Sequence, residues 1–62
     1  MLYAWHDTIT EWSLIVEAPT VDIARIRAVA IVRTTALLDR EARGCLLLAI
    51  HATPPQVQDV HP

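Results

Sequence analysis

The sequence predicts a small α+β domain, a β(β)αβ unit arranged around one long helix. Three observations support this class. The chain has 62 residues, which is enough for one domain and too few for two. Hydrophobic residues make up 53% of it and charged residues 19%, a composition typical of a folded protein. An amphipathic helical pattern runs from residue 20 to residue 43. Short runs rich in branched and aromatic residues, the types favoured in strands, lie on both sides of it.

The helix predicted at residues 20–43 has recognisable signals at both ends. Thr20 follows a proline, and Asp22 places a negative charge in the first turn, where the helix dipole favours it. Gly44 comes directly after Arg43, and a glycine just beyond the last periodic residue is the usual left-handed cap. We therefore expect an uninterrupted helix of about 24 residues, roughly 36 Å long.

Two apolar faces can be drawn on this helix at about 100° per residue. The wider face is the predicted core stripe, made of Ile23, Ile26, Ala30, Thr34, Leu37 and Leu38. A narrower apolar strip lies on the opposite side between arginines, which resembles the apolar centre and polar rim of an interface. We predict a contact surface there, made of Val29, Val32, Ala36, Arg25, Arg33 and Arg40.

A strand pair is predicted before the helix. Residues 11–17 read Glu-Trp-Ser-Leu-Ile-Val-Glu, and residues 2–5 are a suitable partner across a turn at 6–8. After Gly44, the apolar run at residues 45–50 has the length of a buried strand.

A mostly helical alternative stays open. Thr8 begins a possible capping box that would start a helix at 8–18. The second helix would then extend from 20 to 52 through Gly44, because glycine inside a helix costs only about 1 kcal/mol. In either arrangement the domain covers residues 1–53. The proline-containing segment 54–62 lacks apolar mass and is expected to be an extended tail.

Charge and hydropathy exclude several classes of function. The formal net charge is −2, with five arginines and no lysine, and this balance disfavours contact with nucleic acid. No stretch contains the roughly 18 to 20 uncharged apolar residues of a membrane span. The N-terminus has no basic segment before an apolar run, so we expect no secretory leader and a cytoplasmic location.

Candidate catalytic and metal-binding residues are few. Cys45 lies between Gly44 and a run of leucines, a setting typical of an inert buried thiol rather than a nucleophile. His6, His51 and His61 lack the short repeated spacing of zinc ligands. We predict no catalytic, cofactor-binding or metal-binding residue, and we expect no enzymatic activity.

The apolar content is high for so short a chain, which favours association with another protein surface. Trp5 and Trp12 are further candidates for that surface, because tryptophan is enriched at interfaces. We expect a small interaction or structural subunit, as a homo-oligomer or within a larger complex. The arginine-rich, lysine-free composition suggests a bacterial or phage gene. The alternative is a small regulator that contacts nucleic acid, or a nucleic-acid enzyme, through the arginine face.

Overall fold

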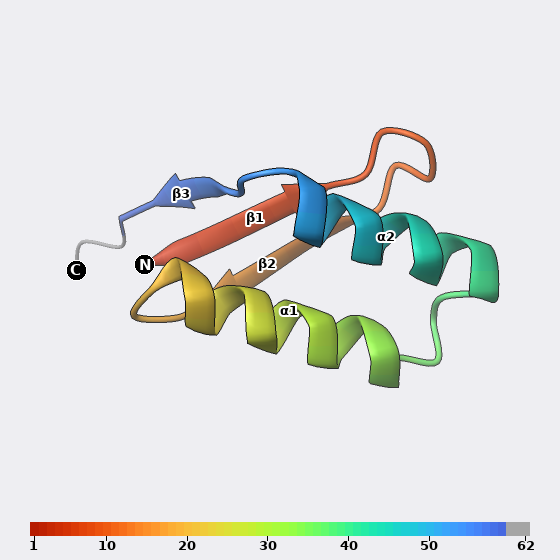
Figure 1. Cartoon of the computed structure of the whole chain (residues 1–62), viewed down its shortest axis with the longest axis horizontal. Coiled ribbons are helices and arrows are strands. Elements are labelled where there is room, and N and C mark those ends of the chain that lie inside the picture. Colours follow the sequence, from red (N-terminus) through yellow and green to blue (C-terminus); the bar gives the residue numbers. More distant parts are fainter. Residues whose placement is uncertain (60–62) are drawn as a thin grey trace.

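Two strands, two helices and a short third strand follow one another along the chain (Figure 1). The computed structural model describes residues 1–59. The elements are β1 (Leu2–His6), β2 (Ser13–Glu17), α1 (Val21–Thr34), α2 (Arg40–Ala52) and β3 (Gln56–Gln58). The predicted α+β class is confirmed.

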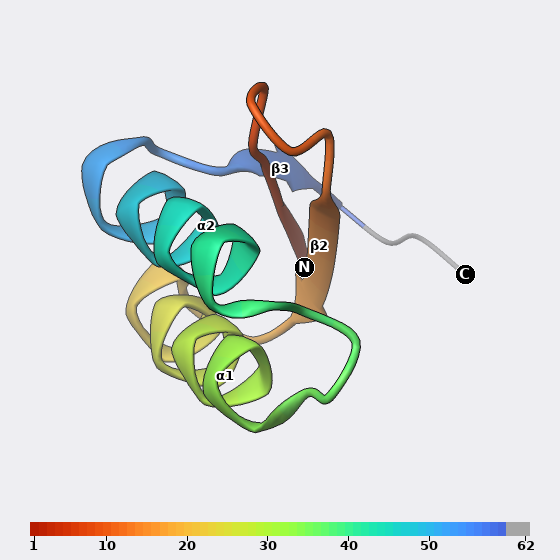
Figure 2. The same cartoon turned by 90° about the vertical axis from the view of Figure 1, so that its right-hand side faces the viewer.

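The three strands form one antiparallel sheet in the order β2-β1-β3. Both helices cover the same face of this sheet, and within residues 1–59 its other face carries no helix (Figure 2). Tyr3 and Trp5 of β1 point toward the helices and are buried, as is Val16 of β2, which pairs with Tyr3. The strand pair predicted from the N-terminal segment is confirmed, and the alternative helix at 8–18 is wrong.

A turn held by Asp7 connects β1 to β2. Its carboxylate accepts hydrogen bonds from the Thr10 hydroxyl and from the Thr10 backbone amide, the latter at 2.9 Å. These bonds stabilise the ionised form and hold the pKa of Asp7 below its ordinary value. Glu11 adopts a left-handed conformation, with φ of 63°, where the chain turns back into β2.

The single helix predicted at 20–43 is wrong, because the chain leaves the helix after Thr34. Thr35 is extended, and Asp39 caps a new helix by accepting a hydrogen bond from the Ala42 amide at 2.8 Å. The Arg43 guanidinium holds the intervening loop by donating to the carbonyls of Arg33, Thr35 and Leu38 at 2.8, 3.2 and 3.0 Å. Because of this break, the second half of the predicted apolar pattern belongs to a separate helix, α2, which folds back against α1.

The strand predicted at 45–50 is also wrong, because these residues belong to α2. Gly44 is not a cap. It lies inside α2 with an ordinary helical φ, it is exposed, and a Cβ added there would have no atom within 4 Å. Leu46 and Ile50, four residues apart, face the core with Ala42, so the run that resembled a strand is one face of an amphipathic helix.

The buried face of α1 is not the predicted one. Its buried residues are Ala24, Ala28 and Val32, whereas Ile26 of the predicted core stripe is 70% exposed and Leu37 is 78% exposed. Of that predicted stripe, Leu38 alone is buried. Helix α1 packs against α2 and β2, and the small side chains of Ala24 and Ala28 allow these elements to approach closely.

Strand β3 comes from the segment that the sequence indicated as a tail after residue 53. It pairs with β1, with Val57 opposite Tyr3, so this part of the segment belongs to the sheet. Residues 60–62, the end of the predicted tail, lie outside the described residues. Within residues 1–59, no helix is long and apolar enough to cross a membrane.

Candidate protein interface

The residues predicted from sequence as an interface do not form one surface. Trp5 and Val32 are 2% and 1% exposed, so both belong to the core and are unavailable to a partner of the folded chain. Val29 is half-buried against the core. The exposed members Trp12, Ala36, Arg33 and Arg40 are spread over the β1–β2 connection, the α1–α2 loop and both helices, and Arg25 is half-buried.

Three of the five arginines are engaged within the molecule. Arg25 donates from Nε to the Ile50 carbonyl at 3.1 Å and so joins α1 to α2. Arg27 donates to the carbonyl of Glu17 at 2.7 Å and joins α1 to the end of β2. Arg43 holds the α1–α2 loop. Of the arginines predicted as the rim, Arg25 is therefore a structural contact between two helices, whereas Arg33 and Arg40 are exposed.

The outer edge of β2 is a more coherent candidate. Along an antiparallel pair, residues whose backbone groups bond to the partner strand alternate with residues whose backbone groups point away from it. Met1 and Ala18 exchange two backbone hydrogen bonds and the Asp7 amide donates to the Trp12 carbonyl, so Trp12 and Ala18 are of the first kind. The backbone groups of Ser13, Ile15 and Glu17 consequently point away from β1. Among the described residues no strand pairs with this edge, and the Glu17 carbonyl receives the Arg27 hydrogen bond.

An apolar groove lies beside this edge on the helix side. It has a volume of about 200 Å³ and runs between β2 and the C-terminal end of α1. Trp12 and Ile31, which line it, are 41% and 43% exposed, and Leu37 from the α1–α2 loop is 78% exposed. Large apolar side chains thus stand open to solvent next to unpaired backbone groups.

A row of side chains on α1 continues this surface. Ile23, Arg27 and Ile31 are spaced four residues apart and therefore lie on one side of the helix. Arg27 contacts the end of β2 and Ile31 lines the groove, so this side of α1 faces the β2 edge. We name the whole the β2-edge surface: the outward backbone groups of Ser13, Ile15 and Glu17, with the side chains of Trp12, Ile15, Ile23, Arg27, Ile31 and Leu37.

The opposite edge of the sheet, formed by β3, is less suited to pairing. Strand β3 has three residues, and Pro54 and Pro55 stand just before it. Short strands and prolines are common devices that keep a sheet edge from adding another strand. Strand β2 is longer and lacks proline.

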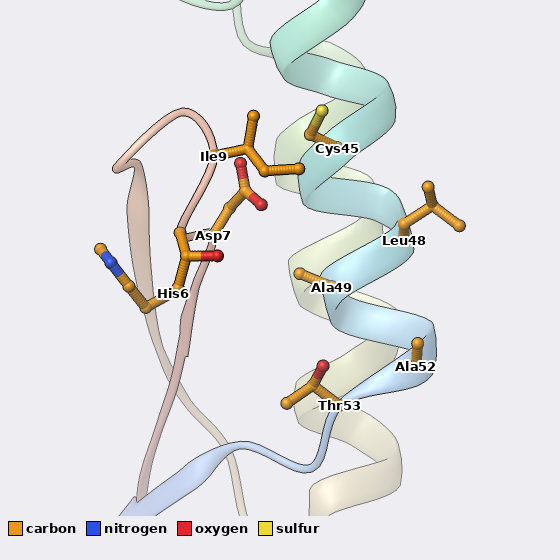
Figure 3. A pocket seen from close by; sticks show the side chains of 9 residues that line it. His6, Asp7, Ile9, Cys45, Leu48, Ala49, Ala52 and Thr53 are labelled. Atoms are coloured by element: carbon orange, nitrogen blue, oxygen red, sulfur yellow. The ribbon is translucent and has the colours of Figure 1, made fainter.

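A second groove lies between the β1–β2 turn and α2 (Figure 3). Its volume is about 360 Å³, and small side chains of α2 line it, including Cys45 and Ala49. The ring of His6 points away from this groove, and the Asp7 carboxylate is engaged by Thr10. Cys45 therefore has neither a histidine nor a cation from these residues to activate its thiol.

One pair of polar side chains resembles a catalytic dyad. His6 Nδ1 and Ser13 Oγ lie 2.8 Å apart on the helix-free face of the sheet, where both residues are exposed. Nucleophilic catalysis also needs a group that orients the base and donors that stabilise the developing oxyanion. The nearest acid in sequence, Asp7, bonds to Thr10 instead. Across residues 1–59, no three His, Cys, Asp or Glu side chains gather as metal ligands would.

Comparisons of the chain with protein-family models, with curated proteins and with solved structures gave no match. The functional interpretation therefore rests on the geometry of the molecule itself.

Sequence reasoning placed Trp12 at an interface but missed Ile15, Ile23, Ile31 and Leu37. One signal for Ile15 was present, because strand alternation separates it from Leu14 and Val16 and places it on the opposite face. For the α1 residues there was none, since either apolar face of that helix could have met the sheet.

Proposed function

We propose that this chain is a non-enzymatic protein-interaction subunit that works by self-association, and that the β2-edge surface is its contact site. The observation that carries the proposal is the unpaired edge of β2 directly beside exposed apolar side chains. An edge strand of this kind is a template for another chain, because its free amides and carbonyls gain partners while apolar area leaves water.

The small size of the chain adds a reason for association. A domain of about 60 residues buries only about 60% of its unfolded surface, so its stability as a monomer is marginal. Each 100 Å² of apolar surface removed from water contributes about 2.5 kcal/mol before the entropic cost of association is subtracted. Ile15 is 65% exposed and Leu37 is 78% exposed, so both have apolar area left to bury.

The alternative, a regulator that contacts nucleic acid through its arginines, has less support. Backbone carbonyls already engage Arg25, Arg27 and Arg43, which reduces the cations free to meet phosphates. The formal net charge of −2 also provides no long-range attraction to a phosphate backbone.

The test is the molar mass of the isolated chain, measured by sedimentation equilibrium from about 1 μM to about 1 mM, a range that covers weak to moderate affinities. We expect a mass above that of one chain, rising with concentration. The double variant Ile31→Glu, Leu37→Glu should shift the equilibrium toward monomer, because it places two charges in the groove.

The matched control is Ile26→Glu, Leu48→Glu, which alters an isoleucine and a leucine that are 70% and 69% exposed and lie away from this surface. It should associate like the parent, and circular dichroism should show both variants folded. A parent chain that stays monomeric at every concentration refutes the proposal. Equal weakening by the control refutes the choice of surface.

A further inference from the structure

We infer that the occupant of the β2-edge surface is a second copy of this chain, with the two β2 strands paired antiparallel about a two-fold axis at Ile15. This inference rests on the proposed function and specifies its geometry. The product is one continuous six-stranded sheet with four helices on a single face.

The pattern of outward backbone groups selects this register. Pairing that joins Ser13, Ile15 and Glu17 of one copy to Glu17, Ile15 and Ser13 of the other uses every outward group of both strands. The carbonyl of Glu17 has a second lone pair, so it accepts from the second copy while keeping the hydrogen bond from Arg27. Any shifted antiparallel register leaves some of these groups unpaired.

The side chains on the helix-free face agree with the same register. Ile15 meets Ile15 of the second copy, which covers a side chain that is 65% exposed in the monomer. Ser13 meets Glu17 of the second copy. Because the Ser13 hydroxyl can accept from His6, with which it is already in contact, it can donate to this carboxylate.

When the two β2 strands pair in this register, the α1 helices of the two copies also come into contact. Helix α1 packs on β2, and its row of Ile23, Arg27 and Ile31 faces the free edge. The two-fold axis sets α1 antiparallel to α1 of the second copy, so Ile23 of each helix lies opposite Ile31 of the other. Adjacent helices pack 8–10 Å apart while strands are about 4.8 Å apart, so one helix covers about two strands and four helices cover six strands without a gap.

Charge is complementary across this contact. Arg27 is held at the C-terminal end of β2 by its bond to the Glu17 carbonyl. Antiparallel pairing brings the N-terminal end of the other β2, preceded by Glu11, to the same place. The two-fold axis repeats the arrangement, so two carboxylates meet two guanidinium groups.

The decisive experiment is a charge exchange read by the dimer dissociation constant. Glu11→Arg and Arg27→Glu should each weaken dimerisation about 10-fold, because each creates two like-charge contacts per dimer. The double variant Glu11→Arg, Arg27→Glu should bind at least about 3-fold more tightly than either single variant, since it restores both charge pairs although the Glu17 carbonyl loses its Arg27 donor. Arg40→Glu, a charge reversal on α2 away from the contact, is the control and should leave the constant unchanged.

A second measurement tests the register without these charges. In a Cys45→Ser background, Ile15→Cys should give a disulfide-linked dimer on mild oxidation, because directly opposed residues have Cα atoms about 5.5 Å apart. Leu48→Cys in the same background should give no disulfide-linked dimer under those conditions.

A dimer that neither cross-links through residue 15 nor recovers in the double charge variant overturns this arrangement and leaves self-association standing. A chain that is monomeric at all concentrations overturns the proposed function and this inference together. If a charge variant loses its circular dichroism signal, it has unfolded and does not report on the contact. The test then rests on the cross-linking variants Ile15→Cys and Leu48→Cys, in which Glu11 and Arg27 are unchanged.

Discussion

The substitution Gly44→Ala should stabilise the protein. Gly44 lies inside α2 with an ordinary helical φ, and the added methyl group would meet no atom within 4 Å. Alanine loses less backbone entropy on folding than glycine, and the difference at an exposed helix interior is about 0.5–1 kcal/mol. For a domain of this size, such a gain raises the melting temperature by roughly 2–8 °C.

The assay is thermal unfolding followed by circular dichroism, at one protein concentration because association makes the melting temperature concentration-dependent. Ala30→Gly is the matched control, since Ala30 is exposed in the middle of α1. It should lower the free energy of unfolding by about the amount that Gly44→Ala raises it. If Gly44→Ala instead lowers the melting temperature, residue 44 is a left-handed cap, and helix α2 as described here is incorrect.

Three further changes test the packing and the two connections. Arg43→Ala should lower the free energy of unfolding by about 1–2 kcal/mol, because three carbonyls at the end of α1 and in the loop after it lose their donor. Arg40→Ala should change the free energy of unfolding by less than about 0.5 kcal/mol, and urea titration measures both variants. Ala28→Leu should lower the free energy of unfolding by about 1–3 kcal/mol in the same titration, because Ala28 is 0% exposed and the core around it has no room for three more carbons. A stability equal to that of the parent would contradict the close packing of α1. The pKa of Asp7 is lower in the folded chain than in the unfolded chain, where it is about 3.9. The ionised carboxylate therefore stabilises the fold at pH values above about 3.9, and this stabilisation is lost as the pH falls through the pKa of the folded state. Thr10→Val should therefore move the pKa of Asp7, followed by NMR, back toward its ordinary value and shift acid unfolding to higher pH.

Local signals in the sequence identified the elements whose partners lie nearby in the chain. The run at 11–17 and residues 2–5 predicted the β1–β2 pair because such a hairpin is specified by strand propensity and a short connection. Thr20 and Asp22 marked the start of α1, where the Thr20 hydroxyl accepts from the Ile23 amide.

The sequence also contains a local signal for the break between the two helices, but the prediction of one continuous helix overlooked it. Asp39 lies inside the single helix predicted at 20–43, although an aspartate ahead of an apolar pattern is equally an N-cap. Gly44 was given weight as a stop signal, yet its effect on an exposed helix position is too small to end a helix that packs through Ala42 and Leu46.

The amino-acid sequence by itself determined the fold class, the hairpin and the start of the first helix, because each depends on propensities and hydrogen bonds within a few residues. Tertiary structure decided which face of α1 is buried. Ile23 and Ile26 are more hydrophobic than Ala24 and Ala28, but α1 meets α2 and β2 through the two alanines, which are 0% exposed and allow close packing. The same choice leaves Ile23 and Ile31 beside the free edge of β2, so the candidate interface follows from packing that no local pattern encodes.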